Sequence, residues 1–221
     1  DLAEGLYIDT ERLQIAYSYA YGSADISGGD NTRTSLSRLF YGLPFKDHFA
    51  IDMKALIVLN DAIGGVTLTS SVTFTSPIDG RTITEGEEVT LHGKEAEYYV
   101  RHRDKAKLDS NNDRMKRQQE YIRAFLASII PAAKKDASLI TKLYDEIKVN
   151  SESTLTLPDV TYMATTVLRK LPSASDIEYV SLTGKITEGE YAELNVTNET
   201  TIRTMLKVFY RPLADVPDTT D

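Results

Sequence analysis

The chain has 221 residues, and its 33 acidic residues against 25 lysines and arginines give a formal net charge of −8. That charge argues against bulk binding to nucleic acid or to an anionic membrane, so we expect no nucleic-acid partner. Cysteine is absent, which excludes disulfides, thiol catalysis and cysteine-ligated zinc. No apolar run reaches about 18 residues, so no segment is expected to span a membrane.

The first hundred residues alternate between helical and strand patterns. Residues 14–21 form a short helix or a strand, and the Gly-, Ser- and Asp-rich residues 22–31 indicate a loop. Gly64 and Gly65 are expected to end a helix in the left-handed conformation. The expected helices cover residues 32–41, 54–63 and 94–99, and the expected strands cover residues 48–53, 66–74 and 89–91.

The second half is mostly helical by its pattern. An amphipathic helix is expected over residues 137–148, and another over 159–171 with Pro158 near its first turn. Residues 177–182 indicate a strand. The last expected helix, residues 200–210, should turn an apolar set inward: Ile202, Met205, Leu206 and Phe209. The mixture predicts an α/β fold, a mixed central sheet with helices on both faces. We expect one domain over residues 1–212 and a polar tail over 213–221.

Four arginines fall within seventeen residues of this acidic chain. Arg101 and Arg103 share one side if the chain there is extended. Arg114, Arg117 and Gln118 are neighbours if their segment is helical. A planar, permanently charged guanidinium suits bidentate contact with phosphate, so the cluster indicates a local anion site. The alternative is a set of surface ion pairs with some of the acids.

The helical pattern around these arginines is strong. Residues 111–113 can cap the helix, and Pro131 is expected just past its end. Gln118 and Arg114 fall at the edge of the apolar stripe, and the far, solvated side is expected to carry Lys116, Glu120 and Arg123. The stripe itself consists of Met115, Ile122, Phe125, Leu126 and Ile129.

Other common chemistry is not indicated. The sequence has no Gly-rich phosphate loop, no dinucleotide-binding fingerprint and no Gly-x-Ser-x-Gly elbow. The histidines His48, His92 and His102 lack metal-ligand spacing. His102 stands between two candidate phosphate arginines, and we expect a structural role for it.

At these motifs the chain resembles the LytR–CpsA–Psr (LCP) family of cell-envelope glycan transferases. The Arg-x-Arg pair and the Arg-x-x-Arg-Gln helix carry the resemblance. It extends to three further stretches: residues 14–22 resemble the family's segment just after its first catalytic motif, residues 39–45 resemble its "gipi" turn, and residues 60–66 resemble its "DavGGV" signature. The resemblance implies an α-β-α sandwich. It also implies that the N-terminal part of the family fold is missing here.

The resemblance implies transfer of a glycan-phosphate from a polyprenyl-pyrophosphate carrier to peptidoglycan, outside the cell at the membrane or wall. By motif position, the catalytic residues would be Arg101, Arg103 and Arg114. Substrate-binding residues would be Arg117 and Gln118 at the pyrophosphate, and Phe125 at an apolar tunnel for the prenyl tail. The expected partners are a polyprenyl-pyrophosphate-linked glycan and a peptidoglycan acceptor. Membrane attachment would come only through an upstream anchor.

Two departures from the family pattern concern magnesium, the expected cofactor. The family has an acid three residues before the first helix arginine, where this chain has Asn111; Asp113 or Asp109 are possible substitutes. The family's upstream Pro-Arg-Asp motif and its other metal-ligating acid are absent, and we expect them upstream of Asp1. The metal ligands are therefore unknown, and enzyme activity is expected only where those acids are present.

Two other functions remain open. The chain could be a non-catalytic module that binds a polyprenyl phosphate or a phosphoglycan of the cell envelope. It could also be a transcriptional attenuator, as an old family label suggests. The acidic charge and the lack of a helix-turn-helix pattern weigh against this last function.

Overall fold

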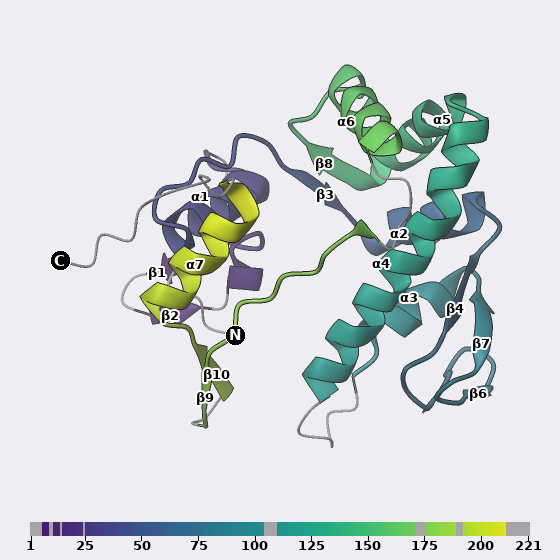
Figure 1. Ribbon diagram of the computed structural model, residues 1–221, viewed down its shortest axis with the longest axis horizontal. Helices are drawn as coiled ribbons and strands as arrows, with labels where there is room; N and C mark the ends of the chain where they lie inside the picture. The colour runs from purple at the N-terminus through teal and green to yellow at the C-terminus, as the bar shows by residue number, and fades with distance from the viewer. Residues whose placement is uncertain are drawn as a thin grey trace, which may run out of the picture. The chain divides into compact units, whose positions relative to one another are not determined.

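The computed structural model describes residues 6–8, 11–13, 15–23, 25–103, 110–170, 176–188 and 192–210. The described residues form a mixed α/β fold, which confirms the predicted class (Figure 1). The chain divides into two compact units, one of residues 49–179 and one that combines residues 1–48 with 180–221. In the described part of the chain, the strands pair two by two in antiparallel ladders, and no helix there is long and apolar enough to cross a membrane.

The unit of residues 49–179 contains six of the described strands and five α-helices. β3 pairs with β8, β4 with β7 and β5 with β6. Its elements in chain order are β3 (Phe49–Ile51), α2 (Met53–Ala62), β4 (Val66–Thr69), β5 (Phe74–Thr75), β6 (Thr82–Ile83), β7 (Glu88–Leu91), α3 (Lys94–Arg101), α4 (Ser110–Lys135), α5 (Ser138–Ile147), η2 (Lys148–Asn150), β8 (Ser151–Ser153) and α6 (Leu157–Lys170).

The hydrophobic core of this unit lies where the β4–β7 ladder meets α3 and α4. β4 alternates buried Val66 and Leu68 with exposed threonines, the period-two pattern that the sequence predicts for a half-buried strand. Every buried hydrophobic side chain among the described residues belongs to this unit. The core cluster consists of Val66, Leu68, Phe74, Ile83, Val89, Leu91, Ala96, Tyr99, Val100 and Tyr121.

Local signals define both ends of α2. It begins after Asp52, whose carboxylate accepts a hydrogen bond from the Ala55 amide at 2.9 Å. It ends before Gly64 and Gly65, which have φ of 83° and 90°. A Cβ at Gly65 would come within 2.5 Å of the His92 ring, so only glycine fits. The predicted glycine stop is therefore confirmed.

α4 differs from its predicted form at both ends. It begins at Ser110, before the expected capping residues, and continues through Pro131 to Lys135. In Figure 1, one half of α4 passes β4 and α3, and the other half reaches α5 and α6. The prediction that Pro131 ends the helix is wrong. Packing of the last turns against α5 and α6 offsets the backbone hydrogen bond that proline removes.

The side of α4 that faces the core also differs from the prediction. Arg117 and Tyr121 are buried, whereas Met115 and Ile122 of the predicted apolar stripe are 41% and 46% exposed. The spacing of apolar residues identifies a stripe, but the neighbouring elements select the side that is buried. β4 and α3 receive the side that carries Arg117 and Tyr121.

The second unit contains shorter elements. Its helix α1 starts earlier than predicted, because the Ser27 side chain accepts from the Asp30 amide at 3.1 Å and caps the helix inside the expected loop. Residues 15–17 form a short 3-10 helix, one of the two forms left open. The elements are β1 (Leu6–Ile8), β2 (Glu11–Leu13), η1 (Ile15–Tyr17), α1 (Gly28–Leu39), β9 (Lys185–Glu188), β10 (Ala192–Asn195) and α7 (Asn198–Phe209).

Aromatic rings connect α7 with the end of α1 in this unit. Phe209 packs edge-on against Phe40 and Phe45, with ring centroids 6.0 and 6.2 Å apart. Ile202 and Leu206 are 40% and 50% exposed, so the prediction that they face inward is wrong. Among the described residues of this unit, the buried side chains are polar, and the apolar contacts of α7 are the ring contacts of Phe209.

Two strand predictions also need correction. Residues 177–182 do not form a strand; instead β9 and β10 form an antiparallel hairpin a few residues later. The predicted strand over residues 66–74 divides into β4 and β5, because Ser70 turns back to accept and donate locally with Val72. The alternation of residue types alone did not reveal where these strands begin and end.

Candidate functional site

The Arg-x-Arg pair lies at the end of α3. Arg101 is the last residue of the helix, so the extended geometry in which Arg101 and Arg103 would share one side does not include Arg101. Its Nη1 donates to the carboxylate of Glu97 one turn earlier at 2.7 Å, and the side chain is 62% exposed. The chain leaves the helix at His102, which is extended, and the exposed Arg103 follows.

Two side chains of α4 hold this end of α3. Arg117 donates from Nε to the carbonyl oxygen of Tyr99 at 2.8 Å and from Nη2 to the carbonyl of His102. Gln118 donates from Nε2 to the carbonyl of Val100 at 3.1 Å. The last carbonyls of a helix have no partner within the helix, so these donors satisfy groups that would otherwise need water. The Arg-x-x-Arg-Gln motif thus brings α4 beside the Arg-x-Arg motif.

Arg117 itself is deeply buried, with 3% of its surface exposed. Its guanidinium carbon lies 5.9 Å from the centre of the Tyr99 ring, and burial lowers the pKa of the guanidinium. The two backbone carbonyls and the ring face compensate the charge. Any contribution of Arg117 to substrate binding would therefore be indirect, through the shape of the α3 end.

Tyr99 of α3 also contacts α4, through Glu120. Its hydroxyl donates to Glu120 Oε2 at 3.0 Å and lies 3.4 Å from Ser70 Oγ. Burial is the main reason that the pKa of Tyr99 is raised. The expectation that Glu120 faces solvent is therefore wrong: it is a half-buried partner for a core tyrosine.

The other end of α3 is held by the "DavGGV" stretch. Asp61 accepts from the Gly93 amide at 2.8 Å, directly before the first residue of α3. The fully buried Asn60 donates to the Leu91 carbonyl at 2.9 Å and accepts from the Tyr121 hydroxyl at 3.0 Å. One polar pair at the end of α2 thus connects β7, α3 and α4.

The structure places the remaining predicted residues on α4. Arg114 is half-buried one turn before Gln118. Phe125 stacks on Tyr121 with ring centroids 6.4 Å apart and packs against the core cluster. The predicted site residues Arg101, Arg103, Arg114, Arg117 and Gln118 thus come from one unit, where the end of α3 meets α4. Their roles in catalysis and binding, and that of Phe125 at a prenyl tail, stay predictions.

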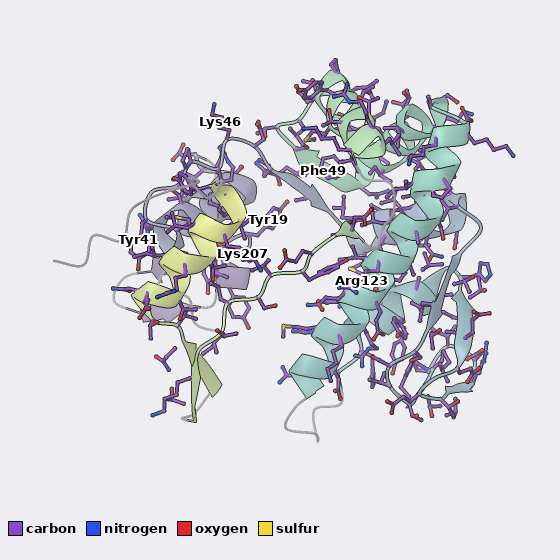
Figure 2. The ribbon with its side chains drawn as sticks, viewed as in Figure 1. Tyr19, Tyr41, Lys46, Phe49, Arg123 and Lys207 are labelled. Atoms are coloured by element: carbon purple, nitrogen blue, oxygen red, sulfur yellow. The ribbon has the colours of Figure 1, made fainter. Side chains whose placement is uncertain are left out.

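Sequence patterns missed several residues that build this region. Tyr99, Tyr121 and Asn60 read as ordinary core or helix residues, since the partner of each lies far away in the sequence. Arg123, labelled on α4 in Figure 2, lies with its guanidinium 4.5 Å from the centre of the Tyr179 ring. Of these residues, only Asn60 carried a signal in the sequence, because it is a polar residue within the largely apolar helix α2.

The described residues contain no complete ligand set for magnesium. In the part of the chain that the structure describes, no group of three or more His, Cys, Asp or Glu side chains could hold a metal ion. Asp113 is half-buried near Arg117, and its charge favours the charged guanidinium. Asp109 and the side chain of Asn111 lie outside the described residues. The magnesium requirement stays a prediction.

The two arginine motifs of this α/β unit thus lie at one helix junction. The chain belongs to the LytR_cpsA_psr family, whose profile matches residues 4–208. The family supports a function in cell-wall glycopolymer transfer in general. A search of curated protein sequences gave no match.

Several solved structures have a similar fold. TagV of B. subtilis superposes with a TM-score of 0.70 at 16% identity, over 93% of this chain and 77% of that one. Protein gbs0355 of Streptococcus agalactiae gives 0.73 at 18%, over 93% and 70%. A structure of TagT bound to LI-WTA gives 0.62 at 20%, over 90% and 71%. At these identities the likeness establishes the fold.

Proposed function

We propose that the chain binds a polyprenyl-pyrophosphate-linked glycan at the junction of α3 and α4 and transfers its glycan-phosphate to a peptidoglycan hydroxyl. Arg101, Arg103 and Arg114 contact the pyrophosphate. Arg117 and Gln118 hold the end of α3 in place. The acceptor lies outside the cell, so the protein acts at the outer face of the membrane or in the wall.

One observation carries this proposal. The bonds from Arg117 and Gln118 to the carbonyls of Tyr99, Val100 and His102, at and just past the end of α3, place the two arginine motifs side by side. Two sequence segments that each suit phosphate thereby lie together in a chain of net charge −8. Family membership and the solved structure of TagT with LI-WTA support a glycopolymer as the partner.

The proposed reaction is a phosphoryl transfer. An acceptor hydroxyl attacks the phosphorus that carries the glycan, and the bond from that phosphorus to the bridging oxygen of the pyrophosphate breaks. Polyprenyl phosphate leaves with the bond electrons, and the hydroxyl proton passes to solvent. Negative charge shifts onto the departing phosphate, and fixed guanidinium groups stabilise that charge. We propose that the transfer requires Mg²⁺, and the assay described below measures that requirement.

Binding can be tested with farnesyl pyrophosphate as a soluble carrier analogue. Isothermal titration should show that Arg101→Ala, Arg103→Ala and Arg114→Ala each weaken binding roughly tenfold or more, because each removes a charge-assisted contact. Arg169→Ala is the matched control, since Arg169 is an exposed arginine on α6 of the same unit. If all four variants bind farnesyl pyrophosphate with the affinity of the unchanged chain, the proposed site is rejected.

The second candidate function is binding without turnover. The lack of a complete metal-ligand group among the described residues favours it. The two functions separate in an assay that follows labelled glycan-phosphate from the lipid carrier to peptidoglycan, with and without Mg²⁺. Transfer that needs Mg²⁺ and is lost in Arg101→Ala supports the transferase. Carrier binding with no transfer under either condition supports the binding module.

A further inference from the structure

The residue between the two candidate phosphate arginines sets the direction of Arg103 relative to Arg101. His102 ends α3: its amide donates to the Tyr98 carbonyl at 2.8 Å, and its own φ and ψ of −53° and 136° are extended. A rotation at His102 would therefore redirect Arg103 relative to Arg101. The backbone is also restrained from the other side, because the His102 carbonyl accepts from Arg117.

The side chain of His102 is held as firmly as its backbone. Nδ1 lies 2.6 Å from the hydroxyl of Tyr98, and the two ring centroids are 4.8 Å apart. The imidazole also stacks on Phe74, with ring centroids 6.1 Å apart and an interplanar angle of 25°. Phe74 is 8% exposed and belongs to the core cluster. The imidazole thus packs on the core, which is the structural position expected for His102.

The Tyr98 hydroxyl can keep its hydrogen bond with His102 Nδ1 over a wide pH range. Burial raises the pKa of Tyr98, so the phenol keeps its proton across the neutral range. A protonated phenol can donate to Nδ1 or accept from it, whichever tautomer the imidazole adopts. The bond also joins residues four apart on one helix end, so it restrains the last turn of α3 directly.

We propose that Tyr98 and His102 are positioning residues of the head-group site, whose bond fixes the turn that aims Arg101 and Arg103. The inference rests on the proposed function, in which these arginines bind pyrophosphate. A turn fixed in advance costs less ordering when the anion arrives than a mobile one. Neither Tyr98 nor His102 needs to touch the ligand.

The test uses the 221-residue chain and inorganic pyrophosphate. Tyr98→Phe removes one hydroxyl and keeps the ring, and it should weaken pyrophosphate binding about three- to tenfold. His102→Asn offers an amide close to where Nδ1 lies and should retain most of the affinity, whereas His102→Leu should lose it. Tyr144→Phe is the matched control, because the Tyr144 hydroxyl also makes a hydrogen bond within this unit, to the Leu155 carbonyl.

A second measurement needs no ligand. In NMR spectra of the free protein, the Nε–H signals of Arg101 and Arg103 should shift in Tyr98→Phe and stay in place in Tyr144→Phe. Melting temperatures show whether each variant is folded. The inference is overturned if Tyr98→Phe leaves either these signals or the affinity as Tyr144→Phe leaves them. If Arg101→Ala with Arg103→Ala binds pyrophosphate like the wild type, the proposed function fails instead, and the NMR signals alone decide the positioning role.

Discussion

A buried arginine is costly unless its donors and charge are matched, and Arg117 shows how this chain matches them. The carbonyl end of a helix carries partial negative charge, and Arg117 reaches two carbonyls there. The Tyr99 ring faces the guanidinium from a third direction. The energetic role of Arg117 is therefore to join α3 to α4, and its effect on any ligand passes through that junction.

Replacing Arg117 should destabilise the fold before it affects a ligand. We expect Arg117→Met to lower the free energy of unfolding by about 2–4 kcal/mol, because two buried carbonyls lose their donors while the side-chain volume is roughly kept. Urea denaturation followed by circular dichroism measures the change. Arg123→Met is the control on the same helix: Arg123 is exposed, so losing its contact with Tyr179 should cost under about 1 kcal/mol. Equal losses in both variants would contradict the anchoring role.

At the scale of elements, α3 is an eight-residue helix fixed at both ends by other elements. Asp61 accepts from the amide before its first residue, and Arg117 and Gln118 donate to its last carbonyls. A helix this short is marginal alone, so its position depends on these contacts and on its buried residues. The end that carries Arg101 is thereby coupled to the packing of α2 and α4.

The coupling between α2 and α4 can be measured through Asn60 and Tyr121. Asn60→Ala should cost about 2–4 kcal/mol, because buried polar groups on β7 and α4 lose a partner. In a double-mutant cycle with Tyr121→Phe, the double variant should cost about 0.5–3 kcal/mol less than the sum of the single variants, since both remove the same bond. Asn60→Ala combined with Tyr144→Phe should be additive. An additive result for the Asn60 and Tyr121 pair would show that the bond contributes nothing of its own.

Sequence patterns predicted those elements whose signals are local. The glycine stop of α2, the amphipathic α5 and the proline in the first turn of α6 all depend on residues within the element. Predictions failed where a distant partner decides. Pro131 remains inside α4, and the buried side of α4 is set by β4 and α3.

The candidate site, too, could be predicted from the sequence only in part. The arginines were recognised by residue type and spacing, which are visible in the sequence. The burial of Arg117 and the contact of Glu120 with Tyr99 were not, because a helical wheel places a side chain on a side without saying what covers it. His102 was expected to be structural, and its stacking on Phe74 supplies the geometry that the sequence lacked.

At the scale of the whole molecule, the two compact units differ in how they are built. The unit of residues 49–179 is one continuous stretch, and it contains every buried hydrophobic side chain among the described residues. The other unit combines two distant stretches, and its fully buried described side chains are Ser18, Ser35 and Thr201. Hydrophobic burial is the main favourable contribution to folding, so the two units should differ in stability.

This difference predicts that residues 49–179 fold alone. The fragment should melt in one cooperative transition and should bind inorganic pyrophosphate within about threefold of the full chain, because the core and the arginine cluster both lie inside it. Calorimetry and titration of the fragment beside the full chain measure both quantities. A broad melt would show that the other unit supplies stability that the buried side chains do not reveal. A cooperative melt with lost affinity would place part of the anion site outside residues 49–179.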